Sequence, residues 1–91
     1  MAHVQRGRER LQARIVRIRG QLDAVARALD EERECGDVLQ QIAAIRGAIT
    51  GLMAQVIEGH VREHLAGQRL STADRQQAAD ELVEVLRRYL K

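Results

Sequence analysis

The stretch from Glu34 to Leu65 limits the fold most strongly, because it has no proline and its apolar residues recur with the period of an α-helix. We predict a helix from Asp37 to Leu65, with Asp37 either capping it or placing a negative charge in its first turn. Its apolar stripe consists of Val38, Ile42, Ile45, Ile49, Leu52, Met53 and Val56. His60 and His64 continue the stripe. Gly47, Gly51, Ala44 and Ala48 make a second face of small residues, which allows another helix to approach closely.

Two further helices are predicted on either side of this one. The first runs from Gln5 to Leu29, and its apolar residues alternate in steps of four and three, as in a helical bundle. They are Leu11, Ile15, Ile18, Leu22, Val25 and Leu29. The acidic segment Asp30–Gly36 is predicted to be a turn, so these two helices should form an antiparallel hairpin.

The third helix is predicted to follow a loop over residues 66–72, in which Gly67 lies near the end of the preceding helix. Ser71 and Asp74 have the spacing of a capping box, and the helix should extend to about Tyr89. Its predicted apolar face is Ala78, Leu82, Val85, Leu86 and Tyr89. The sequence therefore predicts an all-α, single-domain protein over residues 1–91.

Composition agrees with this fold class and excludes several others. The chain has 91 residues, one aromatic residue, and no proline, tryptophan or phenylalanine, which argues against an all-β fold. A single cysteine excludes an internal disulfide and suits a reducing compartment. No uninterrupted apolar run approaches about 18 residues and the charged N-terminus does not resemble a signal peptide, so we expect a cytoplasmic protein that does not span a membrane.

The charge is unevenly distributed along the chain. Residues 1–20 carry six arginines and one glutamate, whereas residues 21–37 carry two arginines and six acidic residues. On a helical wheel, Arg6, Arg10, Arg14 and Arg17 fall within an arc of about 80°. Such a row is either a solvated helix face or a surface that binds phosphates, and arginine favours the second because guanidinium binds phosphate bidentately.

Cys35, His60 and His64 are residue types that bind borderline or soft metal ions. Cys35 and His60 are 25 residues apart, or about 37 Å in one helix, so they cannot meet within a single chain. Two hairpins packed antiparallel would bring Cys35 of one copy to the histidines of the other. The two-fold axis would then pass between Ala48 and Ile49, with Ile45, Ile49 and Leu52 in the dimer core.

On the same hairpin geometry, His3 should lie beside His60 and His64 of its own chain. Spacing alone also allows ordinary structural roles, because a lone cysteine is often a small buried residue and histidines are common on helix surfaces. The two histidines do not form an H-E-x-x-H motif, and no serine, histidine and aspartate arrangement stands out. We therefore do not expect an enzyme.

The run CGDVLQQIAAIRGAITGLMAQVIEGHVREHL, with RIVRIRGQLDAV before it and LRRYLK at the end, resembles the CsoR/RcnR/FrmR family of bacterial metal- and aldehyde-responsive repressors. The resemblance implies a three-helix protomer that assembles as a tetramer, a dimer of dimers. It also implies a protein that binds double-stranded operator DNA without its effector and releases the DNA when the effector binds at an intersubunit site. On this basis Arg14, Arg17 and Arg19 should contact DNA, with Arg6, Arg8 and Arg10 adding charge, and Arg46 should pair with an acidic residue.

The branches of the family differ at four ligand positions, which are here His3, Cys35, His60 and His64. This set is similar to the RcnR branch, which responds to nickel and cobalt. The copper(I) branch has a second cysteine where this chain has His64, and imidazole suits Ni(II) or Co(II) better than Cu(I). Zn(II) and copper stay open as effectors, and Glu34 and Glu63 flank ligands and can support them.

An alternative effector is formaldehyde. The formaldehyde-responsive branch is similar at Cys35 and His60, but it has proline at position 2 and glutamate at position 64, where this chain has Ala2 and His64. In that hypothesis Cys35 reacts with the aldehyde and is joined to the N-terminal amine. The sequence therefore favours a nickel- or cobalt-responsive repressor of a metal-efflux gene, with an aldehyde-responsive repressor as the alternative.

Overall fold

The computed structural model describes residues 2–67 and 69–89, with the side chains of residues 2–6 outside that description. Its helical elements are α1 (Ala2–Asp30), α2 (Cys35–His60), the short π-helix η1 (Val61–Leu65) and α3 (Thr72–Tyr89), and no strand occurs among these residues. The prediction of an all-α chain with three main helices is confirmed. The residues group into two compact units, Met1–Val56 and Ile57–Lys91, and the single-domain organisation stays a prediction.

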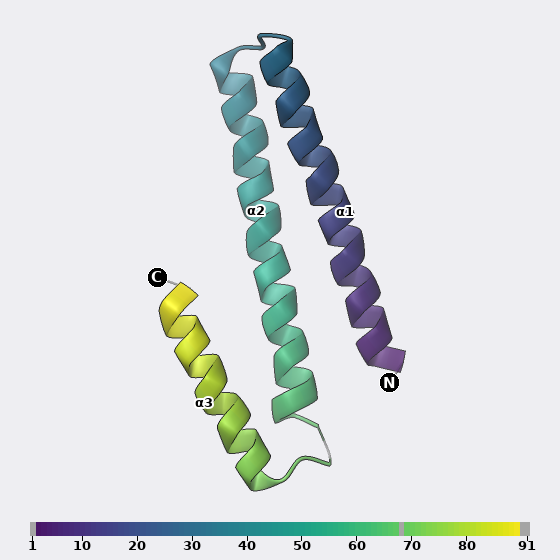
Figure 1. Ribbon diagram of the computed structural model, residues 1–91, viewed down its shortest axis with the longest axis vertical. Helices are drawn as coiled ribbons and strands as arrows, with labels where there is room; N and C mark the ends of the chain where they lie inside the picture. Colours follow the sequence, from purple (N-terminus) through teal and green to yellow (C-terminus); the bar gives the residue numbers. More distant parts are fainter. Residues whose placement is uncertain (1, 68, 90–91) are drawn as a thin grey trace. The chain divides into compact units, whose positions relative to one another are not determined.

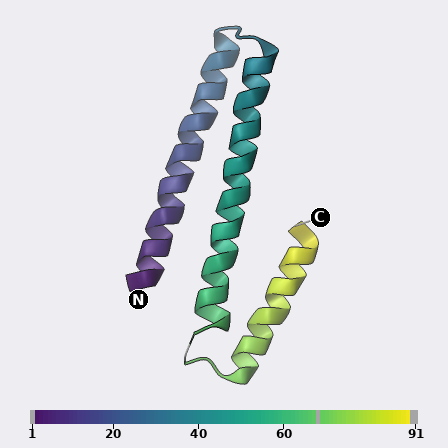
Figure 2. The ribbon, with the colours of Figure 1, turned by 180° about the vertical axis from the view of Figure 1, so that it is seen from behind.

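In the first unit, α1 and α2 lie side by side and run antiparallel (Figure 1 and Figure 2). The residues most buried between them are Ile18, Ala28, Val38 and Ile45. On each helix, one series of buried and half-buried positions alternates in steps of three and four, as expected for two helices packed along one seam. These positions are 11, 14, 18, 21, 25 and 28 on α1 and 38, 41, 45, 48, 52 and 55 on α2.

The hairpin seam uses only part of the predicted apolar stripe of α1. Ile15, Leu22 and Leu29 belong to that stripe, but they are exposed by 37%, 52% and 62% in the hairpin. Arg14, Gln21 and Ala28, each one position earlier, lie in the seam instead. The apolar stripe of α1 is therefore wider than the strip that α2 covers, and the hairpin leaves part of it uncovered.

The turn between α1 and α2 depends on Glu32 rather than on the predicted Gly36. Arg33 N donates to Ala28 O at 3.0 Å and Glu32 N donates to Leu29 O at 3.1 Å, which is the bonding pattern of a Schellman motif. Glu32 takes the left-handed position of that motif, with φ of 55°. Gly36 lies inside α2, which begins at Cys35, two residues earlier than predicted, so Asp37 contributes its charge in the first turn and is not the cap.

In the second unit, α2 ends at His60 and the chain continues through η1 before it turns into α3. Ala66 N donates to Val61 O at 2.9 Å, which closes the wider π turn where a continuous α-helix to Leu65 was expected. Ser71 Oγ accepts a hydrogen bond from Asp74 N at 3.0 Å, so Ser71 caps α3 as predicted. Of the predicted apolar face of α3, Ala78 is buried, whereas Val85 and Tyr89 are exposed.

Replacing Glu32 by glycine tests the turn. A non-glycine residue in the left-handed region costs about 1–2 kcal/mol, so Glu32→Gly should raise the free energy of unfolding by about 1 kcal/mol. Urea denaturation followed by circular dichroism, at one protein concentration, measures the change. Glu31→Gly is the matched control, because Glu31 does not have positive φ and should gain nothing. A loss of stability in Glu32→Gly would contradict this turn geometry.

Candidate metal centre and basic face

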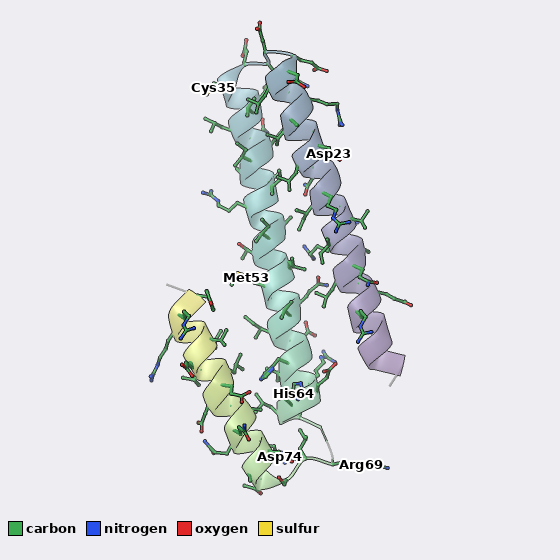
Figure 3. All side chains as sticks on the ribbon, in the orientation of Figure 1. Asp23, Cys35, Met53, His64, Arg69 and Asp74 are labelled. Carbon is green, nitrogen blue, oxygen red and sulfur yellow. The ribbon has the colours of Figure 1, made fainter. Side chains whose placement is uncertain are left out.

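Cys35 is the first residue of α2, beside the hairpin turn (Figure 3). Its thiol is free and exposed, so it is not the small buried residue that a lone cysteine often is. The backbone amides beside Cys35 are already hydrogen-bonded in the first turn of α2, where Asp37 N and Val38 N donate to Glu34 O at 3.0 and 3.2 Å. The sulfur is therefore accessible to a ligand or to a second protein chain.

His60 and His64 come together in the second unit. Their ring centroids lie 4.9 Å apart and the ring planes are tilted by 47°. His60 ends α2, and its Nε2 lies 3.3 Å from Ala78 O. His64 lies in η1 (Figure 3), and its Nε2 is 3.7 Å from Glu63 Oε2. Two imidazoles this close can turn their nitrogens toward one metal ion. The π-helix lies at this pair, and such insertions are frequent at functional sites.

Within the part of the chain that the structure describes, the candidate ligands do not gather into one cluster. Cys35 and His60 are the two end residues of α2, about 37 Å apart by helical rise. Among the described residues, no group of three or more histidine, cysteine, aspartate or glutamate side chains could hold a metal ion. The backbone of His3 lies in α1, but its side chain is outside the described residues.

An exposed apolar stripe runs along α2 between the two candidate ligand positions. Its steps alternate between three and four residues, so its members share one side of the helix. They are Cys35, Leu39, Ile42, Arg46, Ile49, Met53, Val56 and His60, of which Leu39, Ile42, Ile49 and Val56 are exposed by 44–59%. Exposed apolar surface of this extent marks an interaction site.

The stripe revises the predicted dimer core. Ile45 is 6% exposed and lies within its own hairpin, whereas Ile49 is 44% exposed. The exposed residues Ile15, Leu22 and Leu29 of α1 repeat every seven residues, as do Ile42, Ile49 and Val56 of α2.

The arginines of α1 do not share one environment. Arg8, Arg10, Arg17 and Arg19 are exposed, and the side chain of Arg6 is outside the described residues. By helical periodicity Arg10 and Arg17 lie on one side of α1, and Arg8 and Arg19 lie about 160° around it. Arg14 is half-buried and its Nε donates to Gln55 Oε1 at 2.7 Å.

Arg46 has no carboxylate partner among the ion pairs of the described residues, although an acidic partner was expected. It is exposed and stands within the stripe on α2. Its backbone oxygen accepts a hydrogen bond from Thr50 Oγ1 at 3.1 Å. The contacts of its side chain in an assembly stay open.

Comparison with known proteins places this arrangement in a family. Residues 7–88 match the family of metal-sensitive transcriptional repressors. An uncharacterised protein from the bioA 5′ region of Serratia marcescens is 54% identical over the full length of both chains. The transcriptional repressor RcnR of Salmonella typhimurium is 47% identical, also over the full length of both chains.

Two solved structures have the same fold. One is a variant of the formaldehyde-responsive regulator FrmR from Salmonella enterica serovar Typhimurium in which a histidine replaces a glutamate. It superposes with a TM-score of 0.83 at 39% identity, covering 92% of this chain and 94% of that one. The other is the copper-sensing repressor CsoR with Cu(I) from Geobacillus thermodenitrificans, with a TM-score of 0.80 at 30% identity over 91% of this chain and 85% of that one.

The chain therefore belongs to the metal-sensitive transcriptional repressor family that includes CsoR, RcnR and FrmR. This confirms the resemblance seen in the sequence and the expectation that the protein is a regulator and not an enzyme. Membership implies binding to DNA and assembly into oligomers.

Residues Cys35–Leu65 form a helical segment that is long and apolar enough to cross a membrane by length and composition, with a mean hydropathy of 1.2 in its most apolar 18-residue window. The sequence prediction had counted only uninterrupted apolar runs and did not foresee this. A helix that is covered by other copies of the chain has the same composition, and family membership favours that explanation.

Ile49→Glu should reduce the oligomeric state, because it places a charge in the middle of the exposed stripe. Sedimentation velocity of the metal-free protein measures the change, and we expect a shift to smaller species. Gln40→Glu is the control, since Gln40 is exposed and lies away from the stripe on the helical wheel. An unchanged sedimentation coefficient for Ile49→Glu would show that the stripe is not an interface.

Proposed function

We propose that this chain is a nickel- or cobalt-responsive transcriptional repressor. A metal-free homotetramer, a dimer of dimers, binds double-stranded operator DNA in the cytoplasm. Binding of Ni(II) or Co(II) releases the DNA and permits expression of a metal-efflux gene. The observation that carries this proposal is the stripe on α2, which begins with an exposed thiol and ends with a pair of imidazoles.

A two-fold dimer built on this stripe completes the metal site. If two copies of α2 pack antiparallel with the axis near Ala48 and Ile49, Cys35 of one copy lies beside His60 and His64 of the other. Covering the apolar stripe supplies the free energy for this packing, at about 25 cal/mol per Å² of apolar surface buried. Each dimer then has two equivalent sites, and His3 is proposed as a further ligand.

The donor set favours Ni(II) or Co(II) over copper(I). One thiolate and two or three imidazoles are borderline ligands, whereas Cu(I) prefers a site with more sulfur. The full-length similarity to a protein named RcnR supports this choice. Zn(II) accepts the same donors, so it is a competing ion in any titration.

The exposed arginines of α1 are proposed to bind DNA. Arg10 and Arg17 on one side of α1 and Arg8 and Arg19 on the other can contact phosphates, with Arg6 extending the basic segment. Metal binding changes how the hairpins pack and so moves these arginines out of register with the duplex. By linkage, DNA weakens metal binding by the same factor.

The second candidate effector is formaldehyde, which the exposed Cys35 thiol and the structural likeness to FrmR favour. The thiol adds to the aldehyde, and the N-terminal amine then displaces water, which leaves a methylene bridge between sulfur and nitrogen. Intact mass spectrometry after denaturation separates the candidates, because the bridge adds one carbon atom covalently and a metal ion is lost. If the DNA is released and the protein carries that added mass, formaldehyde is the favoured effector.

Cys35→Ala should abolish metal sensing. We expect the thiolate-to-cobalt absorption to vanish. Loss of a residue that only supports a metal ligand typically lowers metal affinity by about 10–100-fold, and Ni(II) affinity should fall by more than this because Cys35 is itself a ligand. Fluorescence anisotropy, on a duplex selected in vitro with the metal-free protein, should show that DNA stays bound when Ni(II) is added. Gln40→Ala serves as the control. Wild-type metal affinity and DNA release in Cys35→Ala would rule out this site.

A further inference from the structure

Arg14 is held against α2 by three contacts within the hairpin unit. Its Nε donates to Gln55 Oε1 at 2.7 Å, and its Nη1 donates to Ala48 O at 3.5 Å. The guanidinium also lies directly over Gly51, where an added Cβ would be 2.6 Å from Nη1 and 3.2 Å from Cζ. We call these three positions on α2 (Ala48, Gly51 and Gln55) the Arg14 seat.

The seat is unusual in two respects. A half-buried guanidinium occupies a helix seam, and the ion pairs of the described residues give it no carboxylate partner. Gly51 costs about 1 kcal/mol of helix propensity compared with alanine, yet alanine would displace the guanidinium. Gly47, one turn earlier, has nothing within 4 Å of an added Cβ. Of these two glycines, only Gly51 provides space for a side chain of the other helix.

Arg14 lies between two exposed arginines on the same side of α1. Arg10 is four residues before it and Arg17 three residues after it, so all three share one strip of the helix. Docking Arg14 on α2 fixes the rotation of α1 about its own axis at the centre of this strip. The two outer arginines are thereby set at a fixed angle to the hairpin, and the like-charge repulsion along the strip is reduced.

We propose that Arg14 is a positioning residue for DNA binding, and that it acts through its seat on α2 instead of through a phosphate contact of its own. The seat fixes the rotation of α1 so that Arg10 and Arg17 are presented together to the duplex. This rests on the proposed function, in which α1 binds DNA, and it changes the role that the sequence suggested for Arg14. Arg17 is expected to contact phosphate directly.

The test compares Gly51→Ala with Gly47→Ala in the metal-free full-length protein. The probe is the fluorescently labelled duplex selected in vitro, and affinity is measured over a range of salt concentrations. Gly51→Ala should weaken binding by about fivefold or more, the lower end of usual coupling between sites. Gly47→Ala should bind as wild type does. Circular dichroism should show both variants folded, because alanine favours the helix and the end of Arg14 can move aside.

Three further variants separate positioning from direct contact. Arg14→Lys keeps the charge but loses the planar donors, so it should weaken binding as Gly51→Ala does. Arg17→Gln should reduce the salt slope by about 0.9 for each phosphate contact that is lost across the assembly. In an Arg14→Ala background, Gly51→Ala should have no further effect, because the side chain that needs the seat is already absent.

Several results would overturn the proposal. Wild-type affinity in Gly51→Ala or in Arg14→Lys would show that the seat does not matter for DNA binding. Wild-type affinity in Gly51→Ala together with weakened binding in Arg14→Lys would show that Arg14 acts through its own contact with the duplex. If the wild-type protein binds no duplex, the proposed function fails together with this inference, whereas wild-type binding that is insensitive to the seat overturns this inference alone.

Discussion

The hairpin of α1 and α2 covers only one of its two apolar sides, and the rest of the account depends on this constraint. Ile18, Val38 and Ile45 are buried within the chain, but the outer stripes of both helices are exposed. In a chain of 91 residues, this outer apolar surface is large compared with the buried core, so a second copy is the natural means of covering it. In the dimer that we propose, the same packing brings the thiol at the start of α2 to the imidazoles at the end of the partner's α2. The proposal therefore makes assembly and effector binding two consequences of one surface.

Polar residues occupy much of the seam inside the hairpin. Gln21 and Gln41 bury side-chain oxygens that have no hydrogen-bond partner in the structure, and Arg14 pairs with Gln55 across the helices. Buried polar groups cost stability but can fix the register of packed helices. A hairpin with an apolar outer face resembles one half of a four-helix bundle. The polar pairs in the seam give the hairpin a defined register, and a partner would add apolar burial on the outer face.

The helices were predictable from the sequence, because the apolar period and the missing prolines are local properties. Helix length also predicts that Cys35 and His60 do not meet in one chain, and a site shared between subunits stays a prediction. The division between seam and outer face was not predictable, since Arg14 and Gln21 are polar residues that lie inside and Ile15 and Leu22 are apolar residues that lie outside. Only the packed hairpin reveals this, because the partner strip on α2 decides which positions are covered. The Schellman turn at Glu32 was also missed, since the left-handed residue is not a glycine.

Mixing two defective subunits tests the central claim most directly. Cys35→Ala supplies only the histidines, and a His60→Ala, His64→Ala double variant supplies only the cysteine. Neither alone should give thiolate-to-cobalt absorption. After the two are unfolded and refolded together, each mixed dimer should regain one of its two sites, which gives about a quarter of the wild-type signal for random pairing. No recovery in dimers shown by mass spectrometry to be mixed would contradict a site shared between subunits.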